Sequence, residues 1–159
     1  MGIRLVNAAG RAGLDVGGRL IDLESNSGGR FGADVMDAIA DWDALCDWAS
    51  GLAAGAGDGS IDESTFGPPV TRSQKVFGVG LNYRGHAAEA GLDIPKEPLI
   101  FTKFPSCLAG PRADVVLTSE RVDYEVELVA VIGRSGRNID EGRAIDHVAG
   151  YCVGQDISD

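Results

Sequence analysis

Residues 123–132, DYEVELVAVI, constrain the fold more than any other segment because their side chains alternate strictly in character. Successive side chains of a β-strand point to opposite faces, so Glu125 and Glu127 would share one face with the valines that follow them. Two carboxylates therefore occupy the first positions of a face that is otherwise apolar. Burying both without a compensating charge would be costly. The pattern predicts a strand whose acidic end is either solvated or held by a cation.

From these residues alone, a solvated strand end is as consistent with the pattern as a metal site. Hard cations such as Mg²⁺, Mn²⁺ and Ca²⁺ prefer oxygen ligands. Two Glu from one strand and a third carboxylate from a neighbouring strand could hold such an ion and leave positions for water or substrate. Asp156, at the end of a predicted strand at 150–155, can supply the third carboxylate.

The rest of the chain predicts an α+β, β-rich fold with two domains. Residues 53–69 are rich in Gly, Ala, Ser and Asp and end in two prolines, a composition typical of a linker. We therefore expect a small N-terminal domain at 1–70 and a second domain at 71–159. Apolar residues at helical spacing predict one or two helices within 34–52. The other predicted elements are strands at 3–6, 14–16, 19–23, 75–81, 99–104 and 114–118, and helices at 83–90 and 140–148.

Charge and cysteine content exclude several classes of function. The chain has 24 Asp and Glu against 14 Lys and Arg, a net charge of −10, which disfavours nucleic acid and anionic membranes as partners. The sequence shows neither a membrane-length apolar stretch nor a signal peptide, so we expect a cytoplasmic protein. The three cysteines have no ligand or disulfide spacing and are expected to be reduced thiols. Cys107 is conceivable as a nucleophile, but a small apolar filler is the simpler interpretation.

A second group of polar residues lies on the predicted helix at 83–90, with Asn82 as its N-cap and Gly91 as its stop. His86 and Glu89 are i and i+3 neighbours, so the carboxylate could orient the imidazole and make it a better base toward water. A solvated surface pair is the simpler interpretation of these two residues alone. We assign no role to His147, the other histidine.

Together these motifs resemble the fumarylacetoacetate hydrolase (FAH) family. The resemblance spans residues 75–159 in the order of the family. Its motifs are VGLNY at 79–83, PLIFTK at 98–103, GP at 110–111, DYEVEL at 123–128, AGY at 149–151 and QDIS at 155–158. The first 70 residues resemble, less specifically, the small domain that precedes the catalytic β-roll in bacterial members. The resemblance implies an incomplete FAH-type mixed β-roll preceded by a small α+β domain.

The resemblance also implies roles for individual residues. Family members bind catalytic Mg²⁺, Mn²⁺ or Ca²⁺ through the two Glu of the strand motif and the later Asp, which here are Glu125, Glu127 and Asp156. The family's water-activating pair corresponds to His86 and Glu89. Lys103 would meet an anionic group of the substrate, although a lysine at a strand end is as often merely solvated.

The implied activity is metal-dependent hydrolysis of carbon–carbon bonds in small anionic 2-oxo acids or 1,3-diketones, in the catabolism of aromatic compounds. Decarboxylation of oxaloacetate and isomerisation of a 2-hydroxymuconate-type diacid remain open within the family. An inactive metal-binding fragment is the hypothesis from another class, because the family's sequence continues well past the point where this chain stops. We expect the chain by itself to be inactive, and the complete protein to form a homodimer or larger homo-oligomer. A glycosidase is excluded because Glu125 and Glu127 share one strand and cannot flank a sugar.

Overall fold

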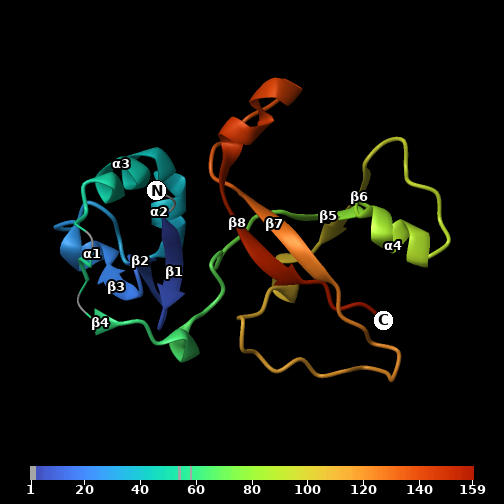
Figure 1. Ribbon diagram of the computed structural model, residues 1–159, viewed down its shortest axis with the longest axis horizontal. Coiled ribbons are helices and arrows are strands. Elements are labelled where there is room, and N and C mark those ends of the chain that lie inside the picture. The colour runs from blue at the N-terminus through green and yellow to red at the C-terminus, as the bar shows by residue number, and fades with distance from the viewer. Residues whose placement is uncertain (1–2, 54, 58) are drawn as a thin grey trace. The chain divides into compact units, whose positions relative to one another are not determined.

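The computed structural model describes residues 3–53, 55–57 and 59–159, and it divides the chain into two compact units. One unit comprises residues 1–71 and 110–159, and the other comprises residues 72–109. Positions 54 and 58 of the predicted linker lie outside the described residues. The predicted boundary after residue 70 stays a prediction. Figure 1 labels the helices and strands.

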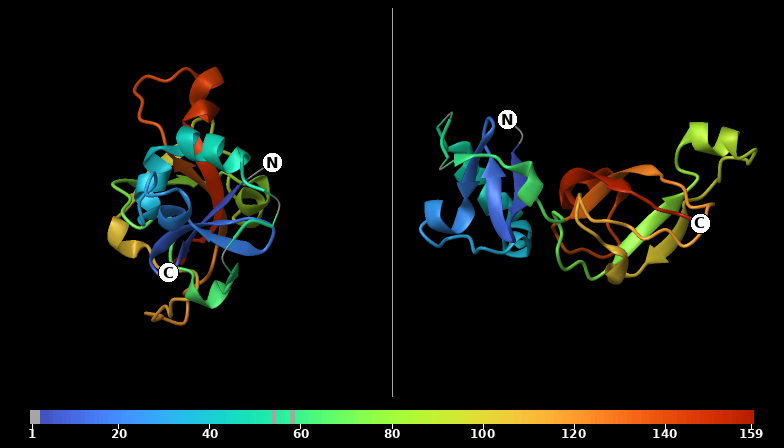
Figure 2. Two further views of the ribbon diagram at one scale, coloured as in Figure 1. Left: turned by 90° about the vertical axis from the view of Figure 1, so that its left-hand side faces the viewer. Right: turned by 90° about the horizontal axis from the view of Figure 1, so that it is seen from below.

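The N-terminal part of the first unit is a four-stranded antiparallel sheet in the order β1-β2-β3-β4, with helices against it (Figures 1 and 2). The strands are β1 (Arg4–Ala8), β2 (Arg11–Asp15), β3 (Arg19–Asp22) and β4 (Gly59–Ser60), and the helices are α1 (Leu23–Asn26), α2 (Val35–Ala40) and α3 (Trp42–Ser50). Ala9 and Gly10 join β1 to β2, and both have positive φ, as a tight hairpin turn of matching twist requires. The segment at 34–52, predicted to hold one or two helices, contains two, α2 and α3.

The core of this part forms between the sheet and its helices. Leu14 and Ile21 from the strands are fully buried beside Leu23 and Leu45 from the helices. Phe31 and Trp48 meet edge to face, with ring centroids 5.6 Å apart. The burial of this cluster fixes α2 and α3 against the sheet and gives this part a hydrophobic core of its own.

The C-terminal part of the first unit is an antiparallel pair, β7 (Val126–Ile132) and β8 (Val148–Gln155). The strands predicted here are confirmed, and β8 is longer than expected. The 3₁₀ helix η3 (Glu141–His147) occupies the position of the helix predicted at 140–148. The strand predicted at 114–118 is wrong. These residues are irregular and do not join any of the described sheets, so a strand there would leave its backbone groups without ladder partners.

The second unit contains the antiparallel pair β5 (Val76–Gly80) and β6 (Leu99–Lys103), joined through α4 (Arg84–Glu89). Gly91 has φ of +65°, so the predicted helix stop is confirmed. The predicted N-cap is wrong by one residue, because Tyr83 holds the N-cap position instead of Asn82. Leu81 has a positive φ of 51°, and the helix begins one residue later than the sequence suggested. Two short 3₁₀ helices complete the described elements, η1 (Glu63–Thr65) in the first unit and η2 (Pro105–Cys107) in the second.

One face of the β7–β8 pair is apolar and exposed. Val126 is 63% exposed on β7 and Val153 is 76% exposed on β8, and they share this face with Leu128, Ile132 and Tyr151. The opposite face carries Glu125, Glu127 and Asp156, which are half-buried. Among the described residues, no helix is long and apolar enough to span a bilayer.

Candidate functional site

The β7–β8 pairing brings Glu125 and Asp156 directly opposite each other. The backbone N–H of Glu125 donates to the Asp156 carbonyl at 3.1 Å, and the N–H of Asp156 donates to the Glu125 carbonyl at 2.8 Å. A residue pair that exchanges both hydrogen bonds has its α-carbons about 5.5 Å apart and its side chains on one face. The two carboxylates, 31 positions apart in the sequence, are therefore cross-strand neighbours.

Glu127 joins this face from the next inward position of the same strand. Its cross-strand partner is Gly154, which has no side chain to occupy the face beside it. Glu125, Glu127 and Asp156 are all half-buried, whereas Tyr124 and Val126, on the other face, are exposed. The three candidate ligands predicted from the sequence thus share one face of a two-stranded ladder.

The side chains of this acidic face do not converge on one point in the structure. Among the described residues, no three His, Cys, Asp or Glu side chains lie close enough together to hold a metal ion. The donors are all carboxylate oxygens, the ligand type that Mg²⁺, Mn²⁺ and Ca²⁺ take. The backbone register suits such an ion, and rotation about the side-chain torsions of Glu125, Glu127 and Asp156 would be needed to hold it.

Backbone hydrogen bonds hold the chain on both sides of Asp156. Ser158 and Asp123 exchange backbone hydrogen bonds of 2.9 and 3.1 Å, which extend the ladder past β8. The Asp159 carboxylate also accepts a hydrogen bond of 2.9 Å from Ser119.

In the second unit, α4 carries the candidate water-activating pair. His86 and Glu89 are exposed, and Ala87 between them is buried and anchors the helix. Within the described chain, neither side chain forms a hydrogen bond or an ion pair, so the predicted contact between them is not formed. His86 and Glu89 therefore stand on one helix as exposed i and i+3 neighbours.

Lys103 ends β6 in the same unit and lies beside an aromatic ring. Its Nζ is 5.9 Å from the centroid of Phe101, at the outer limit of a cation–π contact. Phe101 in turn lies across Gly78, its cross-strand partner, so closely that a Cβ on Gly78 would come within 2.2 Å of the ring. Sequence reasoning missed this arrangement. The signal was the glycine inside the strand pattern at 76–80, which marks a close approach of another group.

The candidate residues therefore form two groups, each positioned by its own unit. Glu125, Glu127 and Asp156 belong to the first unit, and His86, Glu89 and Lys103 belong to the second. The first group offers oxygen ligands on a rigid ladder. The second offers an imidazole, a carboxylate and an ammonium group.

The family model described as fumarylacetoacetate (FAA) hydrolase C-terminal matches residues 75–159, more than half of the chain. This chain belongs to the FAH family. The predicted family membership is confirmed.

Curated relatives of this FAH-family chain include proteins named "Putative hydrolase" from Burkholderia. The protein of B. multivorans is 42% identical over 149 residues, which cover 92% of this chain and 50% of the relative. A protein of B. ambifaria is 41% identical over the same shares. The chain spans about half the length of the curated relatives it matches.

Solved structures confirm the predicted fold class, a partial FAH fold. A "putative HpcE protein" from Mycobacterium smegmatis is 47% identical with a TM-score of 0.85, over 97% of this chain and 55% of that one. A probable 2-hydroxyhepta-2,4-diene-1,7-dioate isomerase from M. abscessus is 28% identical with a TM-score of 0.76, over 99% and 52%. Maleylpyruvate hydrolase from Sphingobium sp. SYK-6, solved with manganese(II) and pyruvate, is 25% identical with a TM-score of 0.75, over 97% and 58%.

Proposed function

We propose that the protein is a divalent-metal-dependent hydrolase that cleaves carbon–carbon bonds in small anionic 2-oxo acids or 1,3-diketones of the acylpyruvate type. The single observation that carries this proposal is the reciprocal hydrogen bonding of Glu125 and Asp156, with Glu127 on the same face. Further support comes from the Sphingobium relative, a maleylpyruvate hydrolase solved with manganese and the 2-oxo acid pyruvate.

Glu125, Glu127 and Asp156 would hold Mg²⁺, Mn²⁺ or Ca²⁺. An ion at these ligands supplies Lewis-acid polarisation of a substrate carbonyl. The chain's acidic net charge of −10 disfavours anionic substrates in general, so a local cation is also needed to receive one.

The second unit would supply the acid–base and substrate-binding groups. His86 would take a proton from the attacking water, and Glu89 would orient the imidazole and stabilise its charged form. Lys103 would bind a carboxylate of the substrate through its ammonium group. We also propose that the protein works as a homodimer or larger homo-oligomer.

Isomerisation of a hydroxydienedioate is the second candidate activity, and the probable isomerase from M. abscessus favours it. An isomerase has no need of an activated water, and His86 and Glu89 make no contact with each other in this structure. Oxaloacetate decarboxylation is a third candidate activity. An inactive metal-binding fragment is the candidate without catalysis.

Product analysis separates these candidates. The complete protein would be incubated with Mn²⁺ and, in turn, an acylpyruvate, a hydroxydienedioate and oxaloacetate, and the products would be identified by mass spectrometry. The proposal predicts that the acylpyruvate yields pyruvate and a carboxylic acid that carries one oxygen from ¹⁸O-labelled water. If only the dienedioate is turned over, without incorporation of label, the protein would be an isomerase and not a hydrolase. Turnover in excess chelator would contradict the proposed dependence on a metal ion.

A further inference from the structure

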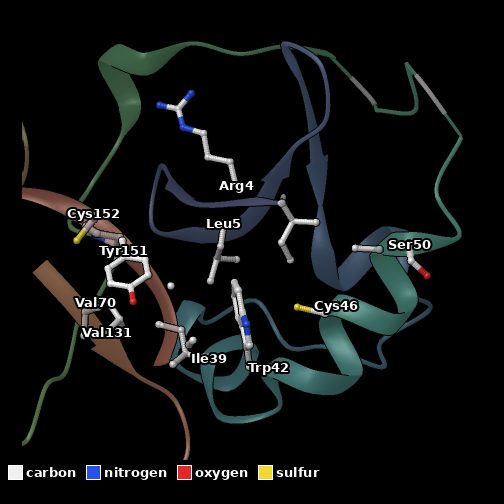
Figure 3. A pocket seen from close by; sticks show the side chains of 15 residues that line it. Arg4, Leu5, Ile39, Trp42, Cys46, Ser50, Val70, Val131, Tyr151 and Cys152 are labelled. Carbon is white, nitrogen blue, oxygen red and sulfur yellow. The ribbon is translucent and has the colours of Figure 1, made fainter. Parts of the chain in front are cut away.

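The first unit contains a pocket of about 630 Å³ that lies away from the acidic end of the β7–β8 ladder. Its walls come from β1, α2, α3, the segment at 69–70, and the apolar ends of β7 and β8 (Figure 3). Leu5, Ile39 and Trp42 turn toward one another from β1, α2 and α3. The volume lies within the range of about 300–1,000 Å³ typical of small-molecule sites.

Contacts within the unit hold these walls together. An ion pair between Arg134, just after β7, and Asp43 ties the ladder to α3. A Cβ built on Gly150 of β8 would stand 4.0 Å from Cζ2 of Trp42, an ordinary van der Waals distance. Gly150 therefore marks the point where a strand and a helix approach each other across the pocket, and the absence of its side chain keeps the space open.

Among the described residues, the lining offers no unpaired charge to a ligand. Arg4 is the cationic residue in it, and its guanidinium is engaged by Asp15 at 2.9 Å and by Glu63 at 3.2 Å. Burial raises the pKa of the Cys46 and Cys152 thiols, so both line the pocket in neutral form at pH 7. A charged ligand would lose its hydration there without gaining a counter-ion.

The remaining polar groups are few and neutral. The Ser50 hydroxyl donates to the carbonyl of Asp47 at 2.7 Å, within its own helix. In the described part of the lining, the Tyr151 hydroxyl and the Trp42 indole N–H are the other hydrogen-bonding side-chain groups, and the rings of these two residues can stack on a flat ligand. We propose that this pocket binds an uncharged aromatic compound carrying one hydrogen-bonding group, at a site separate from the proposed metal centre.

This proposal does not rest on the proposed function, and calorimetry tests it with the chain itself. The probe is 2-naphthol, and the matched charged probe is 2-naphthoate, which has the same rings with a carboxylate. We expect 2-naphthol to bind once per chain, and 2-naphthoate to bind at least about tenfold more weakly, a difference of about 1.4 kcal/mol.

Two variants narrow the pocket from opposite walls. Gly150→Val adds a side chain toward Trp42 from β8, and Cys46→Leu fills the space from α3. Each should raise the Kd for 2-naphthol at least about tenfold. The control is Gly59→Val, which places the same side chain on a strand with nothing within 4 Å and outside the lining.

Circular dichroism and thermal melting show whether both filled variants are folded, so that a loss of binding is not mistaken for a loss of structure. A filled variant that melts as the wild type does and still binds 2-naphthol normally would overturn the proposal, because binding would then reside elsewhere, for example on the exposed surface around Val126, Leu128 and Val153. No binding by the wild type, or binding of 2-naphthoate as tight as that of 2-naphthol, would overturn it as well.

Discussion

At the scale of single residues, the proposed chemistry gives the two groups of candidate residues different roles. In that proposal, carboxylates on the ladder would hold the metal, and the imidazole on α4 would act on water. The two roles predict different consequences when one side chain is removed.

His86→Ala should leave Mn²⁺ binding unchanged and slow hydrolysis by about 10²-fold or more, the usual weight of a general base. Glu127→Ala should abolish Mn²⁺ binding and activity together. Glu120→Gln, which changes an exposed carboxylate outside the proposed site, is the control. Both variants are made in the complete protein, and the two measurements are Mn²⁺ affinity by calorimetry and initial rates with an acylpyruvate. Loss of metal affinity in His86→Ala would show that the roles are assigned wrongly.

Gly78 provides a residue-scale test of how the Phe101 ring packs on β5. Gly78→Ala would bring a methyl group against the Phe101 ring and should lower the free energy of unfolding by about 1 kcal/mol, a typical cost of overpacking. Urea denaturation measures the change. Phe101→Leu removes the obstructing ring, so the double variant should be more stable than the sum of the single changes predicts. Strict additivity would mean that the ring does not rest on Gly78.

At the scale of elements, the junction of β3 and α1 has a pH dependence of its own. Asp22 caps α1 by accepting from the N–H of Ser25, and it also accepts two hydrogen bonds from Arg11, at 2.7 and 3.0 Å. The Arg11 guanidinium lowers the pKa of Asp22 well below its ordinary value of 3.8. A carboxyl group with a lowered folded-state pKa stabilises the fold above its unfolded pKa, and this stabilisation is lost as the pH falls.

We therefore predict that Asp22→Asn makes the free energy of unfolding depend less on pH in the acid range. Between pH 5 and about pH 2, the wild type should lose more free energy of unfolding than the variant does. Asp47→Asn, an exposed position on α3, is the control. Urea unfolding at each pH supplies the free energies. Parallel curves for the wild type and Asp22→Asn would contradict the role of this carboxylate.

The elements also show what the sequence can and cannot predict. Alternation predicted β7 and its acidic face because strand periodicity is a local property, and Gly91 predicted the end of α4 because left-handed φ favours glycine. The strand predicted at 114–118 failed because apolar composition says nothing about whether a partner strand is present. Cross-strand register, which places Asp156 opposite Glu125, depends on the segment that joins β7 to β8 and on the bulge at Val131 and Ile132, and no local pattern encodes it.

At the scale of the whole molecule, the exposed apolar face of β7–β8 should govern association. A two-stranded pair with an uncovered apolar face is prone to pair with other chains. We predict that Val126→Lys with Val153→Lys raises the concentration at which light scattering detects aggregates. Val116→Lys, which changes a valine that is 88% exposed outside the sheets, is the control. An equal effect of this control would mean that total apolar exposure matters rather than this face.

The most direct test of the proposed metal centre is a Mn²⁺ titration of the chain followed by electron paramagnetic resonance. We predict one Mn²⁺ per chain for the wild type, and loss of that binding in Asp156→Asn, because this carboxylate lies across the ladder from Glu125 on the shared acidic face. Asp140→Asn, a change outside that face, should bind as the wild type does. Undiminished Mn²⁺ binding in Asp156→Asn, or no binding by the wild type, would contradict the proposed metal centre.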